Sequence, residues 1–360
     1  MVTVHRFTRA RSVLDHAISA RAFPCAVAEV GRSTGPIWTY ATGRMTYAAD
    51  AREVSPETIF DLASLTKVLA TATVAAVQVS QTALSLDTPV SALLPAWSSE
   101  DRARVTARDL LEHCSGLPAH RKYFETLAGQ PAFEHAICKE ALCYVPRTQS
   151  LYSDPGFMLL GFLLESSDAQ SLDEQFALWR TAVGIVDPIT FRPPRQWRDH
   201  TAPTEIDPWR GRLLVGEVHD ENAAALGGIA AHAGLFGTAA AVGGCARWWL
   251  SLLTGHDDRT TGVTSSTAAT FAERSSVPGS SRALGWDTML PTSSSGTRMS
   301  ARAIGHTGFT GTSLWLDPAT DLYAVLLTNR VHPTRANDQI QPVRRAFHDA
   351  IAADLLGAPV

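Results

Sequence analysis

The residues with the clearest catalytic potential are Ser64 and Lys67, in the stretch Asp61-Leu-Ala-Ser64-Leu-Thr-Lys67. They lie three residues apart at the start of a predicted helix, residues 61–79, so their side chains share one face. A serine hydroxyl becomes a nucleophile when a nearby base takes its proton. A lysine can be that base when burial and positive potential lower its pKa. The spacing by itself allows two interpretations: a serine nucleophile with its base, or a helix cap with a surface lysine.

Two further stretches carry residues that could assist such a serine. Tyr152-Ser153-Asp154 precedes an apolar helical segment, and a tyrosine close to a lysine ammonium can shuttle protons. Alternatively, this stretch only caps the helix that follows. His306-Thr307-Gly308-Phe309 precedes a predicted strand, where the N–H of Phe309 could join that of Ser64 in an oxyanion hole. The alternative here is a glycine turn before a strand.

The elements that must position these residues follow from hydrophobic periodicity. We expect mixed helices and strands near both ends of the chain and mostly helices between residues 60 and 190. The expected helices are 11–20, 61–79, 106–113, 157–165, 172–182 and 343–356, and the expected strands are 26–30, 37–40, 312–316 and 322–328. The helix at 106–113 begins with a capping box of Thr106 and Asp109. Residues 187–212, rich in proline and arginine, and residues 259–281, rich in serine and threonine, are expected to be irregular.

Composition excludes several classes of protein. The chain has 360 residues, 45% of them apolar, and a net charge of −4. Such a chain can bury a sizeable core, and it lacks the basic excess of a nucleic-acid binder. No stretch reaches the ~18 uninterrupted apolar residues of a membrane span. The N-terminus lacks an apolar signal-peptide region and the five cysteines are sparse, so we expect a cytoplasmic protein with reduced thiols.

Taken together, the three groups of residues resemble the S-x-x-K, S-D-N and K-T-G motifs of the serine β-lactamase and penicillin-binding-protein superfamily. The chain is most similar to the class C branch, which includes class C β-lactamases, D-alanyl-D-alanine carboxypeptidases and family VIII-type esterases. The similarity extends over nearly the whole chain, through the stretches Phe60–Lys67, Leu110–Pro118, Tyr152–Asp154, Gly305–Gly311 and Leu327–Arg330.

The resemblance implies an α+β fold of the β-lactamase/transpeptidase type, with an antiparallel sheet flanked by helices plus a helical domain. We expect residues 1–360 to form a single unit. Within it, residues 1–60 and 230–360 would form an α/β subdomain, and residues 61–229 a mainly helical subdomain with irregular loops.

The resemblance also implies a role for each matching residue. Ser64 corresponds to the acylated nucleophile, Lys67 to its activating partner and Tyr152 to the base or proton shuttle. The backbone N–H groups of Ser64 and Phe309 correspond to the oxyanion hole, and no cofactor or metal is needed. The residues expected to contact substrate are Asp154, Trp286, His306, Thr307, Gly308 and Arg330.

Two positions depart from the family pattern. His306 stands where a lysine is usual, and a mostly neutral histidine holds a substrate carboxylate less well than a permanent cation. The change favours a neutral ester or amide, unless Arg330 supplies the missing cation. Asp154 stands where an asparagine is usual, and because a carboxylate only accepts hydrogen bonds, it can pair instead with Lys67.

A second polar cluster lies in residues 204–238 and includes His219, Asp220 and His232. We consider three roles for it. It could be a hydrogen-bonded loop that holds the two subdomains together, a wall of the substrate cleft, or a metal site formed by these three side chains.

These observations predict a serine hydrolase that acts through an acyl-enzyme on Ser64, with esters or amides as substrates. A D-alanyl-D-alanine carboxypeptidase or a class C-like β-lactamase is the alternative within the family. A substrate-binding protein with little turnover is the alternative of another class. The expected partner is a small ester, amide or β-lactam, and we expect neither nucleic-acid binding nor a membrane span.

Overall fold

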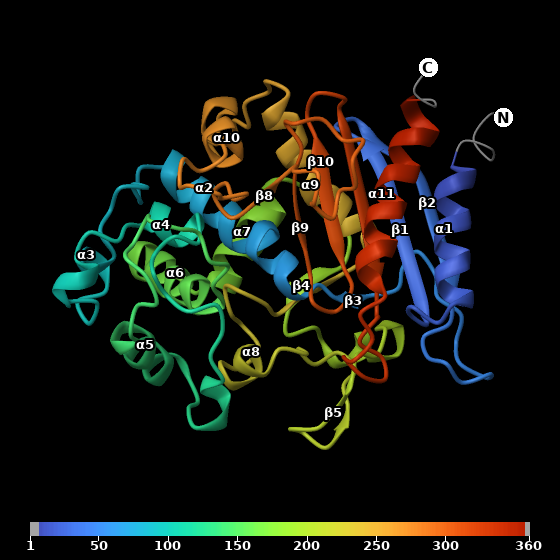
Figure 1. Cartoon of the computed structure of the whole chain (residues 1–360), viewed down its shortest axis with the longest axis horizontal. Helices are drawn as coiled ribbons and strands as arrows, with labels where there is room; N and C mark the ends of the chain where they lie inside the picture. Colours follow the sequence, from blue (N-terminus) through green and yellow to red (C-terminus); the bar gives the residue numbers. More distant parts are fainter. Residues whose placement is uncertain (1–6, 357–360) are drawn as a thin grey trace.

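A six-stranded antiparallel sheet forms the centre of one half of the molecule (Figure 1). The computed structural model describes residues 7–356. From edge to edge the strands are β2 (Gly35–Gly43), β1 (Cys25–Arg32), β11 (Leu322–Thr328), β10 (Ser313–Asp317), β9 (Ile304–Thr307) and β8 (Asp287–Thr288). Ala26 of β1 pairs with Thr328 of β11, so segments from the two ends of the chain meet inside this sheet.

Helices flank the sheet and fill the other half of the molecule (Figure 1). The helices against the sheet are α1 (Thr8–Ser19), α9 (Ala239–Leu253) and α11 (Ile340–Leu356). The others are α2 (Ala72–Ser80), α3 (Val90–Leu93), α4 (Ala107–Leu111), α5 (Gln130–Lys139), α6 (Asp154–Asp168), α7 (Leu172–Ala182), α8 (Glu221–Ala225) and α10 (Ser265–Ala272). The short strands β3 (Phe60–Asp61), β7 (Leu235–Gly237) and β4 (Ile189–Phe191) form a second sheet, and β5 (Ile206–Asp207) pairs with β6 (Arg212–Leu213).

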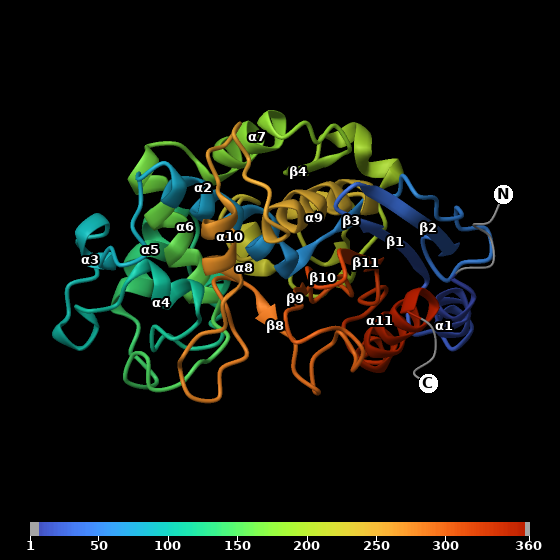
Figure 2. The same cartoon turned by 90° about the horizontal axis from the view of Figure 1, so that it is seen from above.

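Both faces of the central strands of the main sheet are buried, because successive side chains enter two different apolar clusters. Ala26 and Ala28 of β1 pack in a cluster with α1 and α11, whereas Val27 packs in a cluster with α9. Figure 2 shows α1 and α11 together on one face of the sheet and α9 on the other. This alternation is what a strand covered by helices on both faces requires.

Most of the predicted elements are confirmed, with small shifts at their ends. Helix α7 has the predicted bounds, and Thr106 and Asp109 form the predicted capping box at the start of α4. The predicted helix at 61–79 is not continuous. A 3-10 turn (Ala63–Leu65) and a π-helical turn (Lys67–Thr71) precede α2, so Ser64 and Lys67 lie on two different kinds of turn.

Three expectations for the second half of the chain are wrong. Residues 187–212 are not wholly irregular, because they contain β4, a 3-10 helix (Arg195–His200) and β5. Residues 259–281 are not wholly irregular, because they contain α10. Thr264 caps this helix by accepting from the N–H of Thr267, and its residue Phe271 is buried against Trp249. The motif at His306 does not simply precede a strand, since its first two residues belong to β9.

Within the described residues, one helical stretch, Ala63–Ser80, is long and apolar enough to cross a membrane. Of its most apolar window, 78% is buried inside the fold. A core helix of this length passes the same test, so the stretch is only weak evidence for a membrane span.

Candidate active site

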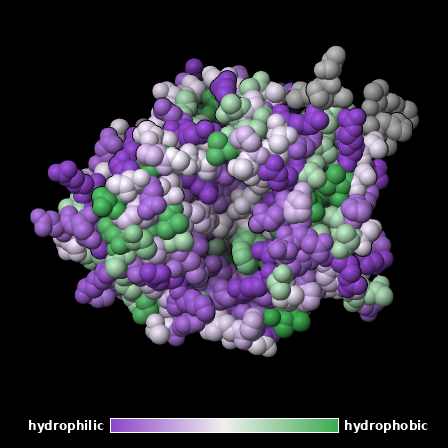
Figure 3. Space-filling model, in the orientation of Figure 1, coloured by the Kyte–Doolittle hydropathy of each residue, from purple (hydrophilic) through white to green (hydrophobic). Residues whose placement is uncertain are grey.

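A cleft of about 600 Å³ lies between the sheet and the helical half, and most of the predicted site residues border it. In the view of Figure 3 a hollow is visible near the middle of this face. The predicted residues along its wall are Ser64, Tyr152, Asp154, His306, Thr307, Gly308, Phe309 and Arg330. Lys67 lies beneath the cleft and is fully buried.

Ser64 lies in a strained turn directly after β3. Its neighbour Ala63 has a φ of +47°, in the left-handed region that an alanine rarely adopts. The buried carboxylate of Asp61 holds this turn: Oδ1 accepts from the N–H of Ala63 at 2.8 Å, and Oδ2 accepts from the N–H of His219 at 2.7 Å. The surrounding structure therefore maintains the strain, as is common at active sites, and leaves Ser64 half-buried in the cleft wall.

The ammonium group of Lys67 has three acceptors for its three protons. Nζ donates to Ser64 Oγ at 3.2 Å, to Asp154 Oδ1 at 2.8 Å and to the carbonyl of His232 at 2.9 Å. Burial lowers the pKa of Lys67, but Asp154 and Tyr152 outweigh burial and raise that pKa above its ordinary value. The condition under which Lys67 could be the base, a lowered pKa, is therefore not met in the resting site, because the adjacent carboxylate favours the charged form.

Tyr152 lies against both Lys67 and Ser64. Burial raises the pKa of the Tyr152 phenol, while its contacts with Lys67 and Ser64 act in the opposite direction. The ring has Lys67 Nζ 4.8 Å from its centroid and the Arg282 guanidinium carbon at 5.1 Å. His113, which sequence reasoning did not assign, packs against this ring in a tilted arrangement, with centroids 4.7 Å apart, and accepts from the N–H of Ser153 at 3.0 Å through Nδ1.

Asp154 pairs with Lys67, as the substitution of asparagine by aspartate predicts. Burial would raise the pKa of Asp154, but Lys67 and His120 hold it well below its ordinary value. Nδ1 of His120 lies 3.7 Å from the second carboxylate oxygen, at the mouth of the cleft. The capping alternative for this stretch is also correct, because Ser153 accepts from the N–H of Gly156 at the start of α6.

The turn between β9 and β10 packs, through Gly308, against the turn that carries Ser64. The N–H of Gly308 donates to the carbonyl of Thr312 at 2.7 Å, and Thr312 Oγ1 donates to the carbonyl of Leu62 at 3.0 Å. A Cβ on Gly308 would lie 2.1 Å from Thr312 Oγ1 and 2.6 Å from the Leu62 oxygen, so only glycine fits here. This contact places Phe309 in the same cleft wall as Ser64, where the prediction puts the two N–H donors.

His306 provides no cation at the position where the family usually has lysine. Its ring is buried and its Nδ1 lies 2.8 Å from the carbonyl of Thr307. Burial, followed by the charges of Arg282 and Lys67, lowers the pKa of His306 well below its ordinary value. The ring is therefore neutral at pH 7.

The proposal that Arg330 supplies the missing cation is not supported by its contacts. Its Nε donates to the carbonyl of Phe309 at 2.8 Å, and one terminal nitrogen donates to the carbonyls of Arg335 and Asn337 at 3.0 and 2.7 Å. These bonds fix the loop that carries Phe309. Arg330 is therefore part of the cleft wall, and most of its donors are already occupied.

The prediction that Trp286 lines the cleft is wrong. Its side chain is fully buried and packs edge-on against Trp249, with ring centroids 5.4 Å apart. Arg282 and Asp287 face each other in a β-bridge and border the cleft. Neighbouring residues of an extended strand point to opposite sides, so Trp286, next to Asp287, points into the core.

Arg282 is the cleft cation that sequence reasoning missed. Within residues 7–356 its guanidinium makes no hydrogen bond, and its ion-pair partner, Asp287, is 4.0 Å away. Two other arginines of the cleft are occupied: Arg335 binds Glu205 and Glu221, and Arg344 binds backbone carbonyls. No motif marks Arg282 in the sequence, because Tyr152, the cleft residue whose ring it covers, is distant along the chain.

The cluster at residues 204–238 forms part of the cleft wall. Nε2 of His219 lies 2.9 Å from Glu205, and Nε2 of His232 lies 2.8 Å from Asp220. The two histidines bind different carboxylates, so the metal site proposed from the sequence is wrong. His219 and Asp220 border the cleft, and the carbonyl of His232 binds Lys67, which supports the two other roles.

Comparisons with known proteins identify the family. The Beta-lactamase family model matches residues 10–347, and the chain therefore belongs to the β-lactamase family of serine hydrolases. A curated relative, the putative D-alanyl-D-alanine carboxypeptidase of Escherichia coli K12, is 29% identical over 323 residues, which cover 79% of this chain and 72% of the relative.

Solved structures confirm the predicted α+β fold. A class C β-lactamase from Rhodobacter sphaeroides superposes with a TM-score of 0.73 at 20% identity, over 95% of this chain and 98% of that one. A family VIII carboxylesterase superposes with a TM-score of 0.75 at 18% identity, over 99% of both chains. The branches named from the sequence motifs are thus the ones to which this chain is similar.

Proposed function

We propose that this protein hydrolyses esters or amides of small carboxylic acids by two-step acyl transfer on Ser64. The observation that carries this proposal is the convergence of three groups in one cleft. Lys67 Nζ is 3.2 Å from Ser64 Oγ, and Tyr152 contacts both. The carboxypeptidase and carboxylesterase to which the chain is similar are both named for the hydrolysis of a carboxyl derivative.

In the resting site, Lys67 and Tyr152 together hold one proton more than the reactive form does. The raised pKa of Lys67 and the raised pKa of Tyr152 keep both groups protonated at neutral pH. The reactive form has lost one proton, and the apparent pKa of that loss belongs to the pair. In this form Tyr152 accepts the proton of Ser64 while the Lys67 ammonium stabilises the phenolate.

Acylation then proceeds by addition and elimination. Ser64 Oγ attacks the carbonyl carbon, and the N–H groups of Ser64 and Phe309 stabilise the negative charge that develops on the carbonyl oxygen. Collapse of the adduct expels the alcohol or amine, which takes the proton from Tyr152. Water attacks the acyl-enzyme with the same pair as base, and this step releases the acid and restores Ser64.

Arg282 favours a second class of substrate, an ester or amide that also carries a carboxylate. Its guanidinium borders the cleft next to Tyr152 without a hydrogen-bond partner in the described part of the chain. Guanidinium groups bind carboxylates through paired N–H donors. A peptide with a free C-terminal carboxylate, or a β-lactam, has such a group.

The proposal is tested by initial rates on p-nitrophenyl butyrate and on a chromogenic cephalosporin. We expect the wild type to hydrolyse the ester and Ser64→Ala to lose that activity. The matched control is Ser80→Ala, in the same helical segment but outside the cleft, which should retain full activity. Ester hydrolysis that persists in Ser64→Ala would refute the assignment of the nucleophile, and the cephalosporin rate ranks the two substrate classes.

A further inference from the structure

His219 has one contact near each of the two residues whose N–H groups would stabilise the oxyanion, Ser64 and Phe309. Its backbone N–H donates to Asp61 Oδ2 at 2.7 Å, and the other oxygen of Asp61 accepts from Ala63, next to Ser64. Its ring stacks on the ring of Phe309, with centroids 5.7 Å apart and planes 25° apart.

The side chain of Phe309 depends on this stacking because it lies outside the core. It is 49% exposed, which is unusual for a large apolar residue. His219 covers it at the distance given above, and the guanidinium carbons of Arg330 and Arg335 lie 4.4 and 6.0 Å from the ring centroid. Arg330 also binds the carbonyl of Phe309, so both the side chain and the backbone of Phe309 are held from this side.

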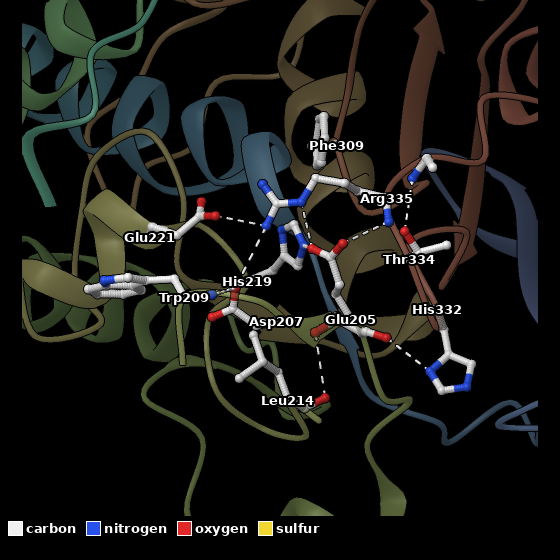
Figure 4. A network of polar contacts seen from close by, with 12 residues as sticks. Glu205, Asp207, Trp209, Leu214, His219, Glu221, Phe309, His332, Thr334 and Arg335 are labelled. Atoms are coloured by element: carbon white, nitrogen blue, oxygen red, sulfur yellow. Dashed lines mark hydrogen bonds and ion pairs between the residues drawn. The ribbon is translucent and has the colours of Figure 1, made fainter. Parts of the chain in front are cut away.

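A buried carboxylate fixes the groups that hold Phe309. Glu205 is almost fully buried, and its Oε2 lies 2.9 Å from His219 Nε2 and accepts from Arg335 Nε at 2.6 Å. Its other oxygen accepts from the N–H of Arg335 at 2.8 Å. Figure 4 shows Glu205 between His219 and Arg335, with Phe309 beyond them.

We propose that Glu205 and His219 are positioning residues of the oxyanion hole, which act on the reaction through Phe309 and through the turn of Ser64. This inference rests on the proposed function. A displacement of about 1 Å in a catalytic group can lower a rate about 100-fold. A network that fixes both donors therefore affects the transition state more than the binding of the ground state.

The test is a double-mutant cycle read by covalent labelling of Ser64 with a fluorophosphonate. The phosphoryl oxygen of this probe gains negative charge during attack, as a carbonyl oxygen does, so the measurement does not need the natural substrate. The variants are His219→Ala, Phe309→Ala and the double variant, together with Glu205→Gln. Glu217→Gln, in the same segment but paired with Arg212 outside the cleft, is the matched control.

We expect each of His219→Ala, Phe309→Ala and Glu205→Gln to lower the saturating labelling rate about 10- to 100-fold, with little change in the half-saturating probe concentration. His219→Ala removes only the ring and keeps the backbone N–H that binds Asp61. The double variant should therefore label within about threefold of the slower single variant, because the two side chains act through one ring contact. Glu217→Gln should label like the wild type. Melting temperatures identify unfolded variants, and His219→Gln replaces His219→Ala if the latter does not fold.

Two results would overturn the inference: single effects that multiply in the double variant, or an effect confined to the half-saturating concentration. Failure of the proposed function gives a different result. If the wild type is labelled at Ser64 but hydrolyses no ester, the proposed hydrolysis is refuted. The double-mutant cycle then still tests the inference about Glu205 and His219. A wild type that is not labelled at Ser64 refutes both.

Discussion

Lys67 Nζ lies 2.8 Å from Oδ1 of Asp154, and this ion pair determines the protonation state of the site. The lysine side chain is fully buried, whereas 17% of the aspartate side chain is exposed to the cleft. Because the carboxylate favours the charged lysine, Lys67 in the resting state is a hydrogen-bond donor to Ser64 and not its base. The basic form of the site therefore appears only as the pH rises.

The first prediction concerns Asp154→Asn and the pH dependence of the rate. Asp154 raises the pKa of Lys67 and also that of Tyr152. Removal of its charge should lower the apparent pKa of the pair, so the alkaline limb of kcat/KM should move to lower pH. The measurement is a pH–rate profile on a neutral ester between pH 5 and 10, with Glu217→Gln as the control. If the alkaline limb of Asp154→Asn stays in place or moves to higher pH, Asp154 does not raise the apparent pKa of the pair.

A second prediction concerns the charge preference that Arg282 gives to the cleft. Arg282→Ala should lower kcat/KM for a p-nitrophenyl hemiester with a free carboxylate about 10-fold or more relative to p-nitrophenyl butyrate, because a hydrogen bond to a charged group contributes ~1.5–3 kcal/mol. Taking the ratio of kcat/KM for the two substrates on the same variant cancels any change in the chemical step that affects both equally. Arg302→Ala, an exposed residue outside the cleft, is the control. Equal losses on both substrates would show that Arg282 does not bind the carboxylate.

The third prediction concerns Gly308→Ala. The added Cβ would lie 2.6 Å from the carbonyl oxygen of Leu62, which is backbone and cannot rotate away. We expect the turn that carries Phe309 to shift and kcat to fall about 100-fold, the effect of losing one oxyanion donor. Gly244→Ala in α9, where the nearest atom would be a side-chain carbon at 3.3 Å, should retain activity. Wild-type kcat in a folded Gly308→Ala protein would argue against this role.

The fourth prediction separates stability from binding at Trp286. Trp286→Phe should lower the free energy of unfolding by about 1–3 kcal/mol, because it leaves a cavity beside Trp249. The KM for a neutral ester should be unchanged, since the side chain is fully buried and does not border the cleft. Urea unfolding and steady-state kinetics measure the two quantities. An increase in KM without a loss of stability would restore Trp286 to the substrate site.

Local patterns were enough to predict the fold class and most of the elements, and to select Ser64 and Lys67, whose Oγ and Nζ atoms lie 3.2 Å apart in the structure. Apolar periodicity located α7 and β11, and the capping box located the start of α4. The spacing of Ser64 and Lys67, joined with the stretches at Tyr152 and His306, indicated the family. These signals are readable because each depends on residues close together in the chain, where backbone geometry alone limits which side chains can share a face.

Contacts between distant segments could not be predicted in the same way. The sequence offered Arg330 as the cleft cation, yet Arg330 binds carbonyls and Arg282 borders the cleft without a hydrogen-bond partner in the described residues. A hairpin register that no motif encodes directs Trp286 into the core.

The protonation state of Lys67 and Tyr152 is a property of the same kind. Residue types and motifs select Ser64, Lys67 and Tyr152, and the short spacing keeps the first two near each other. The charge on Lys67, however, depends on Asp154, 87 positions along the chain, and on the degree of burial around them. A pKa depends on distance and desolvation, and both arise only when the packed fold brings remote residues to within a few ångströms of one another.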